Sequence, residues 1–558
     1  MRRMIAVATA AVLAATLAAC GGGRVRGSDS DQPAVNASPA AGDTSPAESS
    51  GAGTSDSTKT AQPSGTFVYS YHLNVVTDWD PATSYSNEII AMENIYESLT
   101  HYDPATGKVL PGLATRWEES DGGATWTFTL RSDVTFHTGR AMDAQAAKDA
   151  IERTIKLKGG PAYIWDSVKS IEAPSATTLV FRLKYPAPLD LISSSAYAAY
   201  IYDTKAAGSG DLVDWFNKGQ DAGTGPYTVA SWTKGADVEL RLKAYDKYWG
   251  GWKSDNYQQV EFRVTPQVTT AWQLLQSGDV DFVDRLNPQL FAQAQKVAAI
   301  QTTTSASFQN LLALYNTADG PMSNVKVRKA IQDAIDTKGL LAALKGADGA
   351  ASGVVPEGLL GYTDGLQLTQ NLEEAKTLLA EAGYGPDGKK LTLTLTYAQG
   401  DDDQQLFVTL LTSALSQLGV TLQATPMQWS AQWDQAKSTD TAKRQDIFVM
   451  YWYPDYADAY SWFANVFHSA DPPYFNLTYL RNAQVDKKID EIPELTATDK
   501  GKAESVYQEL NKTLVQDLAV VAPLFVEKYE RALAGDVKGY VDNPAYPDVV
   551  FVHELTHS

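Results

Sequence analysis

Cysteine is almost absent from this 558-residue chain, in which Cys20 is the only one. A single cysteine forms no internal disulfide and builds no metal site made of several thiolates. Basic residues are also few, with 46 Lys and Arg against 66 Asp and Glu and a formal net charge of -20. Nucleic-acid binding depends on Lys and Arg that meet phosphates, so this balance argues against a nucleic-acid partner. No apolar run after residue 19 is long enough to span a bilayer.

Common catalytic motifs are missing as well. The sequence contains no GxxxxGK[ST] phosphate loop and no GxSxG nucleophile elbow. The one formal match is HELTH at 553–557, which has the HExxH spacing of zinc proteases. That chemistry needs both histidines on one face of a helix, whereas His553 follows the strand-like residues 549–552. We therefore expect no catalytic residue, no metal and no cofactor; a surface zinc hydrolase that uses His553 and His557 is the alternative from another functional class.

The first 20 residues have the pattern of an export signal. Arg2 and Arg3 precede an apolar, alanine-rich run, and residues 17–20 read Leu-Ala-Ala-Cys. A charged start, a short apolar core and small residues before the cleavage point are typical of a secretory signal peptide. The ending resembles the lipobox of bacterial lipoproteins, in which the cysteine is acylated and becomes the first mature residue. We expect a signal peptide at 1–19 and an extracytoplasmic protein that a lipid on Cys20 anchors to the cell membrane.

The composition changes twice after the cysteine. Residues 21–64 are mostly small or polar and contain no aromatic residue, so we predict a disordered tether over 20–64. Beyond it, hydrophobic patterns with a period of two predict strands, and patterns with a period of 3.6 predict helices. The expected strands are 67–71, 126–130, 178–183, 260–264 and 391–397, and the expected helices are 88–99, 143–157, 371–383 and 404–418. Helices and strands alternate throughout, which predicts an α/β or mixed α+β fold, and the length predicts two or three domains.

Several motifs occur in a fixed order along the chain. They are DWDPA (78–82), NIYESL (94–99), LPGLATRWEESDG (110–122), WTFTLR (126–131), VTFHTG (134–139), GTGPY (223–227), YDKYW (245–249), LYNT (314–317), VKVRKAI (325–331) and AID (334–336). Together they resemble the family 5, or peptide/nickel-type, extracellular solute-binding lipoproteins of ABC importers. The resemblance implies a large, two-lobed periplasmic-binding-protein-like fold with an extra third domain, whose lobes close over a ligand. The implied parts are lobe I at 65–109, 221–315 and 523–558, the extra domain at 110–220, and lobe II at 316–522.

The resemblance also implies a ligand site. The motif WYPDYAD at 452–458 looks like the segment from which peptide-binding members present an aspartate to the α-amino group of the ligand. Asp455 takes that place, and a buried ammonium needs such a carboxylate because an unpaired buried charge is costly. The extended backbone of Tyr451, Trp452 and Tyr453 would pair with the peptide like an added strand. The remaining implied contacts are Trp429, which matches an aromatic residue of the pocket, and Tyr85, Ser86 and Asn87 from the opposite lobe.

One departure from the family pattern concerns the ligand carboxylate. Peptide binders often carry an Arg shortly before the tryptophan of this segment, whereas residues 447–451 are uncharged here. Lys437, Lys443 and Arg444 are the candidate partners that remain. We expect a monomeric binding protein, not an enzyme, that captures di- to oligopeptides and delivers them to ABC permease subunits in the membrane. A sugar or another non-peptide solute is the alternative ligand.

Overall fold

The computed structural model describes residues 62–345, 349–385 and 388–557. All of them belong to one compact unit, Lys59–Ser558. The predicted signal peptide, Cys20 and the predicted tether up to residue 61 lie outside the described residues. Within the described ranges, no helix combines the length and the apolar character that crossing a membrane requires.

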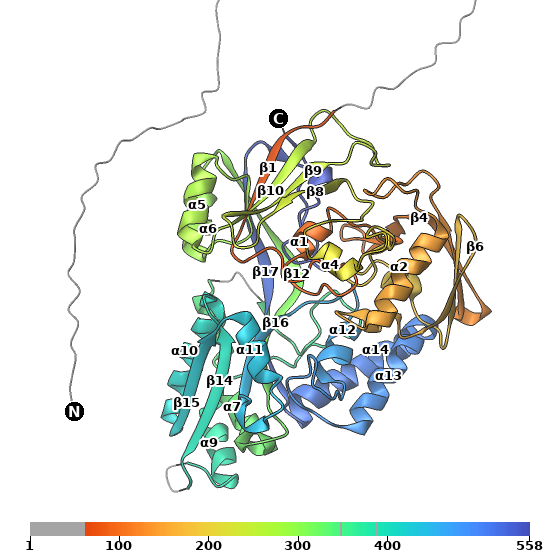
Figure 1. The fold of residues 1–558 in the computed structure, drawn as a ribbon. Coiled ribbons are helices and arrows are strands. Elements are labelled where there is room, and N and C mark those ends of the chain that lie inside the picture. The colour runs from red at the N-terminus through yellow and green to blue at the C-terminus, as the bar shows by residue number, and fades with distance from the viewer. Residues whose placement is uncertain (1–61, 346–348, 386–387, 558) are drawn as a thin grey trace, which may run out of the picture. The chain divides into compact units, whose positions relative to one another are not determined.

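A mixed sheet of 11 strands organises this unit, in the order β15-β14-β16-β12-β17-β11-β1-β10-β9-β8, with β13 paired to β17. The strands are β1 (Ser64–Tyr71), β8 (Tyr227–Trp232), β9 (Val238–Ala244), β10 (Tyr257–Val264), β11 (Phe282–Val283), β12 (Ile300–Tyr315), β13 (Gly349–Ala350), β14 (Leu391–Ala398), β15 (Val420–Met427), β16 (Ile447–Trp452) and β17 (Val521–Ala534). We call β1 and β8–β11 the β1 region, and β14–β16 the β14 region. The long strands β12 and β17 lie between the two regions and connect them (Figure 1).

The strand directions bring the ends of the two regions together. β1, β10 and β11 run parallel to one another, and so do β14, β15 and β16. β12 is antiparallel to both β16 and β17, and β17 is antiparallel to β11. β16 and β11 therefore run in opposite directions, and the carboxyl end of each points toward the other region. We call the place where these ends face each other, alongside β12 and β17, the junction. In open α/β sheets, ligands bind outside the carboxyl ends of the strands.

A smaller antiparallel sheet packs beside the β1 region and has the order β4-β5-β7-β6. Its strands are β4 (Ala114–Ser120), β5 (Thr125–Leu130), β6 (Val168–Ser175) and β7 (Thr178–Leu183). Helix α2 (Ala144–Leu157) covers this sheet and buries its alanine-rich face with Ile151 in the core formed by Phe128 and Phe181. The helix begins at a cap in which the Asp143 carboxylate accepts a hydrogen bond from the Ala146 amide. We call this part the small-sheet region.

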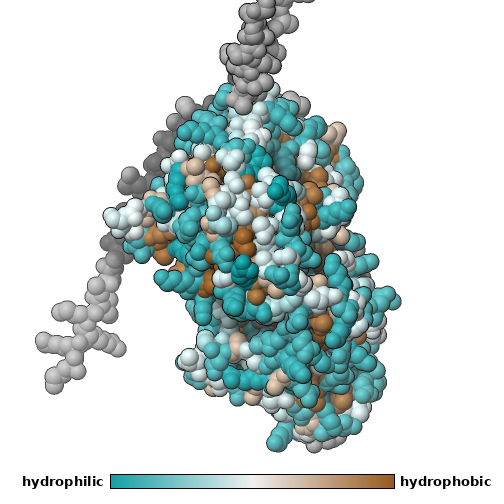
Figure 2. Space-filling view, turned by 90° about the vertical axis from the view of Figure 1, so that its right-hand side faces the viewer, coloured by the Kyte–Doolittle hydropathy of each residue, from teal (hydrophilic) through white to brown (hydrophobic). Residues whose placement is uncertain are grey.

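The remaining helices cover the faces of the sheets. They are α1 (Ile89–Met92), α3 (Leu189–Ile192), α4 (Leu212–Phe216), α5 (Val268–Ser277), α6 (Pro288–Ala294), α7 (Val325–Ala334), α8 (Thr337–Ala343), α9 (Leu372–Glu381), α10 (Asp402–Gln417), α11 (Trp429–Ala436), α12 (Tyr460–Trp462), α13 (Ala483–Thr498) and α14 (Lys500–Lys512). Short hairpins pair β2 (Thr100–Asp103) with β3 (Lys108–Pro111), and β18 (Val537–Lys538) with β19 (Thr556–His557). Hydrophilic residues dominate the face in Figure 2, where hydrophobic residues form only small, separate patches.

Most of the predicted elements are confirmed. The expected strand at 178–183 is β7, and those at 67–71, 126–130, 260–264 and 391–397 lie within β1, β5, β10 and β14. The expected helices at 143–157, 371–383 and 404–418 correspond to α2, α9 and α10 within a few residues. The fold class is also confirmed, because helices and a mixed sheet alternate along the chain. The domain boundaries given above stay a prediction.

Two predicted elements are wrong. The helix expected at 88–99 ends at Met92, because tertiary partners take the carbonyl groups that would continue it. The Asn94 carbonyl accepts a hydrogen bond from the Tyr227 amide at 3.0 Å, and the Ile95 carbonyl accepts one from the Gly225 amide at 2.9 Å. Residues 549–551 form no strand, although their composition suggested one, and a 3-10 turn follows at Val552–Glu554.

Candidate functional site

Asp455 lies three residues beyond β16, at the junction, and its two carboxylate oxygens have different surroundings. Oδ2 accepts hydrogen bonds from the Tyr163 hydroxyl at 2.6 Å, the Ser461 hydroxyl at 2.9 Å and the Asn465 amide at 3.2 Å. Oδ1 has no hydrogen-bond partner among the described residues. Burial raises the pKa of Asp455 to about 6. The group is therefore mostly ionised at neutral pH, with one oxygen held by the protein and the other available.

The backbone around Asp455 joins the β14 region to the loop that follows α3. The Asp455 carbonyl accepts hydrogen bonds from the Ser195 hydroxyl at 2.7 Å and from the Ala196 amide at 3.2 Å. The Tyr197 hydroxyl donates to the Ser86 carbonyl at 2.6 Å and lies 3.0 Å from the Tyr453 hydroxyl. Tyr197, from a third segment, thus links two of the predicted ligand residues, Ser86 and Tyr453.

A buried glutamate shapes the loop that carries Tyr85, Ser86 and Asn87. Glu88 accepts hydrogen bonds from the Tyr85 amide at 2.8 Å and the Ser86 amide at 2.9 Å through Oε1, and from the Thr77 amide at 3.2 Å through Oε2. Burial raises the pKa of Glu88, and these backbone donors offset part of that effect. The Asn87 amide donates to the Asn74 carbonyl at 3.0 Å, so this side chain also fixes the loop.

Three other predicted residues belong to one group of aromatic rings, which we call the Phe475 cluster. Its members are Tyr85, Trp429, Trp433, Trp452, Tyr474 and Phe475. The Phe475 ring lies 6.4 Å from Tyr85 and 5.2 Å from Trp452, while Trp433 lies 5.1 Å from Trp429. Tyr85, Trp429 and Tyr474 are 40%, 37% and 40% exposed, so the cluster offers aromatic surface to a solute.

The three cations expected near a ligand carboxylate have different environments. The Lys437 ammonium lies 4.8, 4.7 and 5.4 Å from the ring centres of Trp433, Tyr474 and Phe475, and burial lowers the pKa of Lys437. Lys443 pairs with Asp440 at 3.5 Å. Arg444 stacks over a tyrosine ring and donates to the Ser438 carbonyl at 2.9 Å. Of the three, only Lys437 contacts the Phe475 cluster.

Tyr451 lies on β16 opposite Leu311 of β12, and its ring is 6.3 Å from that of Phe525 on β17. Tyr451 therefore lies at the side of the junction that is next to β12 and β17. Sequence reasoning did not identify Tyr163, Tyr197 or Phe475, which come from distant segments and carry no local signal. Trp433 was detectable, because it follows Trp429 by four residues on α11 and so lies on the same helix face.

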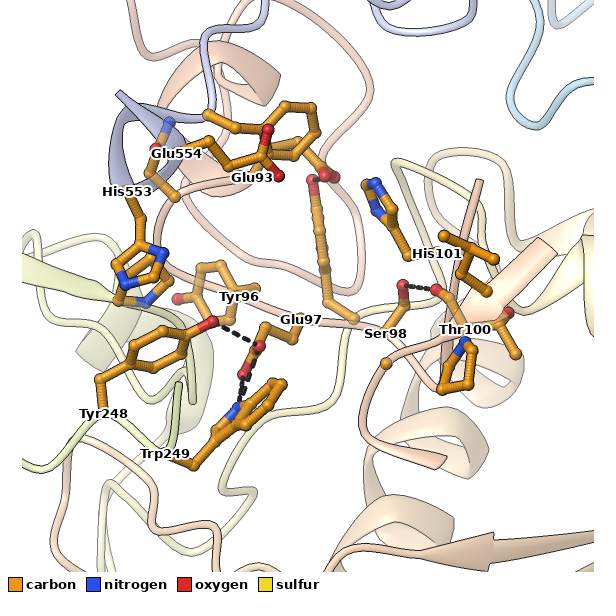
Figure 3. A pocket seen from close by; sticks show the side chains of 17 residues that line it. Glu93, Tyr96, Glu97, Ser98, Thr100, His101, Tyr248, Trp249, His553 and Glu554 are labelled. Carbon is orange, nitrogen blue, oxygen red and sulfur yellow. Dashed lines mark hydrogen bonds between the residues drawn. The ribbon is translucent and has the colours of Figure 1, made fainter. Parts of the chain in front are cut away.

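The structure also contains a cavity of about 240 Å³ that includes none of the predicted ligand residues (Figure 3). Within it, Glu97 accepts hydrogen bonds from the Trp249 indole at 2.9 Å and the Tyr248 hydroxyl at 3.3 Å, and Glu93 accepts one from a tyrosine at 2.9 Å. Burial raises the pKa of Glu93 to about 8 and that of Glu97 to about 7. Both acids therefore carry reduced charge at neutral pH.

The histidines of the HELTH motif do not converge on a common point. His553 lines the cavity and its Nε2 lies 2.8 Å from the Gly251 carbonyl, whereas Nε2 of His557 lies 3.0 Å from the Ser64 carbonyl. A 3-10 turn and the short strand β19 carry them, not a helix. In the described part of the chain, no group of three or more His, Cys, Asp or Glu side chains is placed to hold a metal ion.

Comparisons with known proteins find relatives along most of the chain. Residues 108–473 match the sequence model of bacterial extracellular solute-binding proteins, family 5 middle. The probable D,D-dipeptide-binding periplasmic protein DdpA of Escherichia coli K12 is 27% identical over 488 residues, which are 86% of this chain and 92% of that protein. The oligopeptide-binding protein AppA of Bacillus subtilis 168 is 23% identical over 475 residues, which are 81% of this chain and 84% of that protein.

Solved structures share the fold. Bacillus subtilis AppA in complex with a nonapeptide has a TM-score of 0.77 at 22% identity, and the match covers 89% of this chain and 100% of that one. NikA from Brucella suis in complex with Fe(III)-EDTA has a TM-score of 0.75 at 23% identity, with coverage of 88% and 100%. Proteins with the same fold therefore hold chemically different solutes, so the ligand has to be inferred from the junction itself.

Proposed function

The chain belongs to the family 5 bacterial extracellular solute-binding proteins, and we propose that the solute it binds is a peptide with a free amino terminus. Proteins of this family are the binding components of ABC importers and not enzymes, so the chain captures a solute outside the cytoplasm without transforming it. In this proposal a lipid on Cys20 anchors the protein to the membrane, and ABC permease subunits receive the peptide.

The observation that carries the proposal is that Oδ1 of Asp455 has no hydrogen-bond partner among the described residues. Three protein donors hold Oδ2, so the carboxylate has a fixed orientation before any ligand arrives. An ammonium group that enters the junction loses water and needs a negative partner. The α-ammonium of a peptide can donate to Oδ1 while the three existing hydrogen bonds to Oδ2 remain. Such charge-assisted hydrogen bonds are about twice as strong as neutral ones.

The edge of β16 supports binding of the peptide main chain. β12 pairs with all six residues of β16, whereas β14 pairs with β16 only at Ile447 and Phe448. Among the described residues, no strand therefore pairs with the β14-facing edge of β16 from Met450 to Trp452. An extended peptide can add to such an edge through its own amide and carbonyl groups, which recognises the main chain and tolerates varied side chains.

Names of relatives agree with a peptide but do not require one. The two curated relatives described above are named for dipeptides and oligopeptides, another is a nickel-binding protein, and one solved neighbour holds agropinic acid. The Phe475 cluster would suit an apolar side chain, and it would equally suit the face of a sugar ring. The test therefore has to separate peptides from neutral solutes.

Calorimetric titration of the purified protein provides this test. The probes are L-Ala-L-Ala, D-Ala-D-Ala, trialanine and tetra-alanine, their N-acetylated forms, and maltotriose as a neutral solute. We expect at least one free peptide to bind and its N-acetylated form to bind at least tenfold more weakly. Binding of maltotriose together with no heat from any peptide would refute the proposal. Mass spectrometry of solutes that co-purify with the protein gives an independent identification of the natural ligand.

A further inference from the structure

The cavity of about 240 Å³ in Figure 3 contains none of the residues of the proposed peptide site. Most of its walls come from four distant segments: the turn after α1, the β2–β3 hairpin, residues 248–249 and the C-terminal residues 551–554. The side chain of Asn94 fixes the last segment, because it donates to the Val550 carbonyl at 2.8 Å and accepts from the Val552 amide at 2.9 Å. The start of the HELTH motif therefore forms part of a cavity wall.

Glu93 has one carboxylate oxygen that no protein group holds. Oε1 accepts a hydrogen bond from the Tyr200 hydroxyl at 2.9 Å, whereas Oε2 forms no hydrogen bond and no ion pair with any described residue. The side chain lines the cavity and is only partly buried, so Oε2 is open to it. Glu97 is held on both oxygens, by the Trp249 indole at 2.9 Å and by the Tyr248 hydroxyl at 3.3 Å. Oε2 of Glu93 is thus the acceptor that remains for a donor from another molecule.

The cavity walls carry acidic groups without a basic one. Glu93, Glu97 and the exposed Glu554 line the cavity, whereas no Lys or Arg in the described part of the chain does. Burial lowers the pKa values of His101 and His553, so these two wall residues are mainly neutral at pH 7. The raised pKa values of Glu93 and Glu97 are what desolvation causes when no cation compensates it. A positively charged ligand would supply the missing charge.

Aromatic rings form the apolar part of the walls, and neighbouring rings hold them in place. The ring centre of Tyr248 lies 5.4 Å from that of Trp249, and the ring of Phe551 lies 5.5 Å from that of His101. Arg131 stacks on Trp249 at 3.8 Å but does not line the cavity. Such rings suit an alkyl chain, and the faces of tyrosine and tryptophan also attract a cation. The volume is below the roughly 300–1,000 Å³ of sites for drug-sized molecules, so the ligand is small.

A metal ion fits these walls less well than an organic cation. Among the described residues, no three His, Cys, Asp or Glu side chains converge as a metal site requires. The hydrogen bonds from Trp249, Tyr248 and Tyr200 also occupy carboxylate oxygens that a metal would need. An ammonium group has three donors of its own and can use Oε2 of Glu93 while these hydrogen bonds persist.

We propose that this cavity is a second binding site, which takes a small organic cation with an alkylammonium group. The ammonium donates to Oε2 of Glu93, and the alkyl part lies against the rings of Trp249 and Phe551. A charge-assisted hydrogen bond forms in this way without loss of the one that Tyr200 donates to Oε1. The site is independent of the junction, so the inference does not rest on the identity of the solute bound there.

Binding at Glu93 should depend on pH. The pKa of Glu93 is about 8, so the group is mostly protonated at pH 7, and an ammonium ligand would favour its ionised form. Binding should therefore release a proton, and the affinity should rise from pH 6 to pH 8, where an alkylammonium keeps its charge. The other titratable groups that face Glu93 or share the cavity with it are Tyr200, Tyr546, Glu97, Tyr248, His101, His553 and Glu554. The tyrosines stay protonated over this range, because burial raises their pKa values.

The experiment is a calorimetric titration with butylammonium chloride and with 1-butanol, a neutral molecule of the same shape. We expect butylammonium to bind wild type, and 1-butanol to bind at least about tenfold more weakly. Glu93→Gln should weaken butylammonium binding by a similar factor, because the amide removes the charge but keeps an oxygen for the Tyr200 hydroxyl. Glu530→Gln is the matched control and should bind like wild type. Glu530 is also a partly buried glutamate with a raised pKa, but it does not line the cavity.

A further variant separates this site from the junction, where butylammonium can pair with Asp455. Loss of butylammonium binding in Asp455→Asn but not in Glu93→Gln would overturn the inference. No heat from butylammonium, equal affinity for 1-butanol, or an affinity that does not rise from pH 6 to pH 8 would overturn it as well. The comparison with 1-butanol and the pH series use wild type alone, so they decide the question even where thermal unfolding shows that Glu93→Gln is misfolded. Calcium or zinc binding without any butylammonium binding would assign the cavity to a metal instead.

Discussion

Replacing Asp455 with Asn should make the protein more stable and at the same time a weaker peptide binder. The pKa of Asp455 rises from 3.8 to about 6 because the protein removes part of the water around its carboxylate. A carboxyl group with a raised pKa favours the folded state only when it is protonated. That contribution is complete below pH 3.8 and is lost as the pH rises through about 6.

The size of the stability effect follows from the shift. Each pKa unit corresponds to about 1.4 kcal/mol, so at pH 7 the ionised carboxylate costs the folded state up to about 3 kcal/mol. Because Asp455 is partly exposed, solvent screens part of this penalty, and we expect Asp455→Asn to gain about 1–2 kcal/mol. The amide keeps an oxygen that can accept hydrogen bonds from Tyr163 and Ser461, so the local geometry survives.

The effect on binding has the opposite sign. Removal of the carboxylate leaves the ligand ammonium without a negative partner in the junction. This loss should cost about 2–5 kcal/mol, or roughly 30- to several-thousand-fold in Kd. N-acetylation of trialanine should cost wild type a similar factor and Asp455→Asn little. Asp458→Asn is the control, because Asp458 lies three residues further on and its carboxylate already accepts hydrogen bonds from the Tyr507 hydroxyl and the Tyr460 amide. That variant should keep the full dependence on acetylation.

Urea unfolding at pH 7 and pH 4, together with calorimetric titration, measures both effects. The stability gain of Asp455→Asn should be present at pH 7 and nearly absent at pH 4, where wild-type Asp455 is protonated. A structural role in the loop predicts the reverse, a variant that is less stable at pH 7. Lower stability of Asp455→Asn at pH 7, or unchanged affinity for trialanine, would refute the reasoning.

Three further outcomes are expected. The affinity of wild type for trialanine should fall roughly tenfold from pH 7 to pH 5 as Asp455 is protonated, and a pH-independent Kd by calorimetry would contradict this. Small-angle scattering should show a smaller radius of gyration with saturating trialanine, because we expect the two regions that β12 and β17 connect to close around the ligand. An unchanged radius would count against closure. Cys20→Ala should abolish fatty-acid labelling in the host cell, and persistent labelling would exclude Cys20 as the anchor.

Sequence patterns predict the regular elements well where burial is periodic. The alternation at 178–183 gives β7 with its observed bounds, and Asp143 marks the start of α2 through its cap. The pattern at 88–99 misleads because apolar residues on both sides of a short turn mimic a helical stripe. The carbonyls of Asn94 and Ile95 bond with amides more than 100 residues away, which no local pattern reveals.

The site is predictable only in part for a similar reason. The resemblance identifies Asp455, but its partner Tyr163 is 292 residues away in the chain. Tyr197 also carries no motif, and its hydroxyl donates to the Ser86 carbonyl, 111 residues away in the chain. Strand direction is set by the order of pairing in the whole sheet, so residues that meet at the junction cannot be found from spacing along the sequence.

The carboxylate at the junction distinguishes between the two classes of solute more sharply than the aromatic rings do. Oδ1 of Asp455 has no hydrogen-bond partner among the described residues. Closure around a neutral sugar would remove water from this charge without compensating it, which is costly for a partly buried group. Under the proposed function, the α-ammonium of a peptide would form a charge-assisted contact with this oxygen on the same closure. Desolvation would then oppose closure on a sugar and favour closure on a peptide with a free amino terminus.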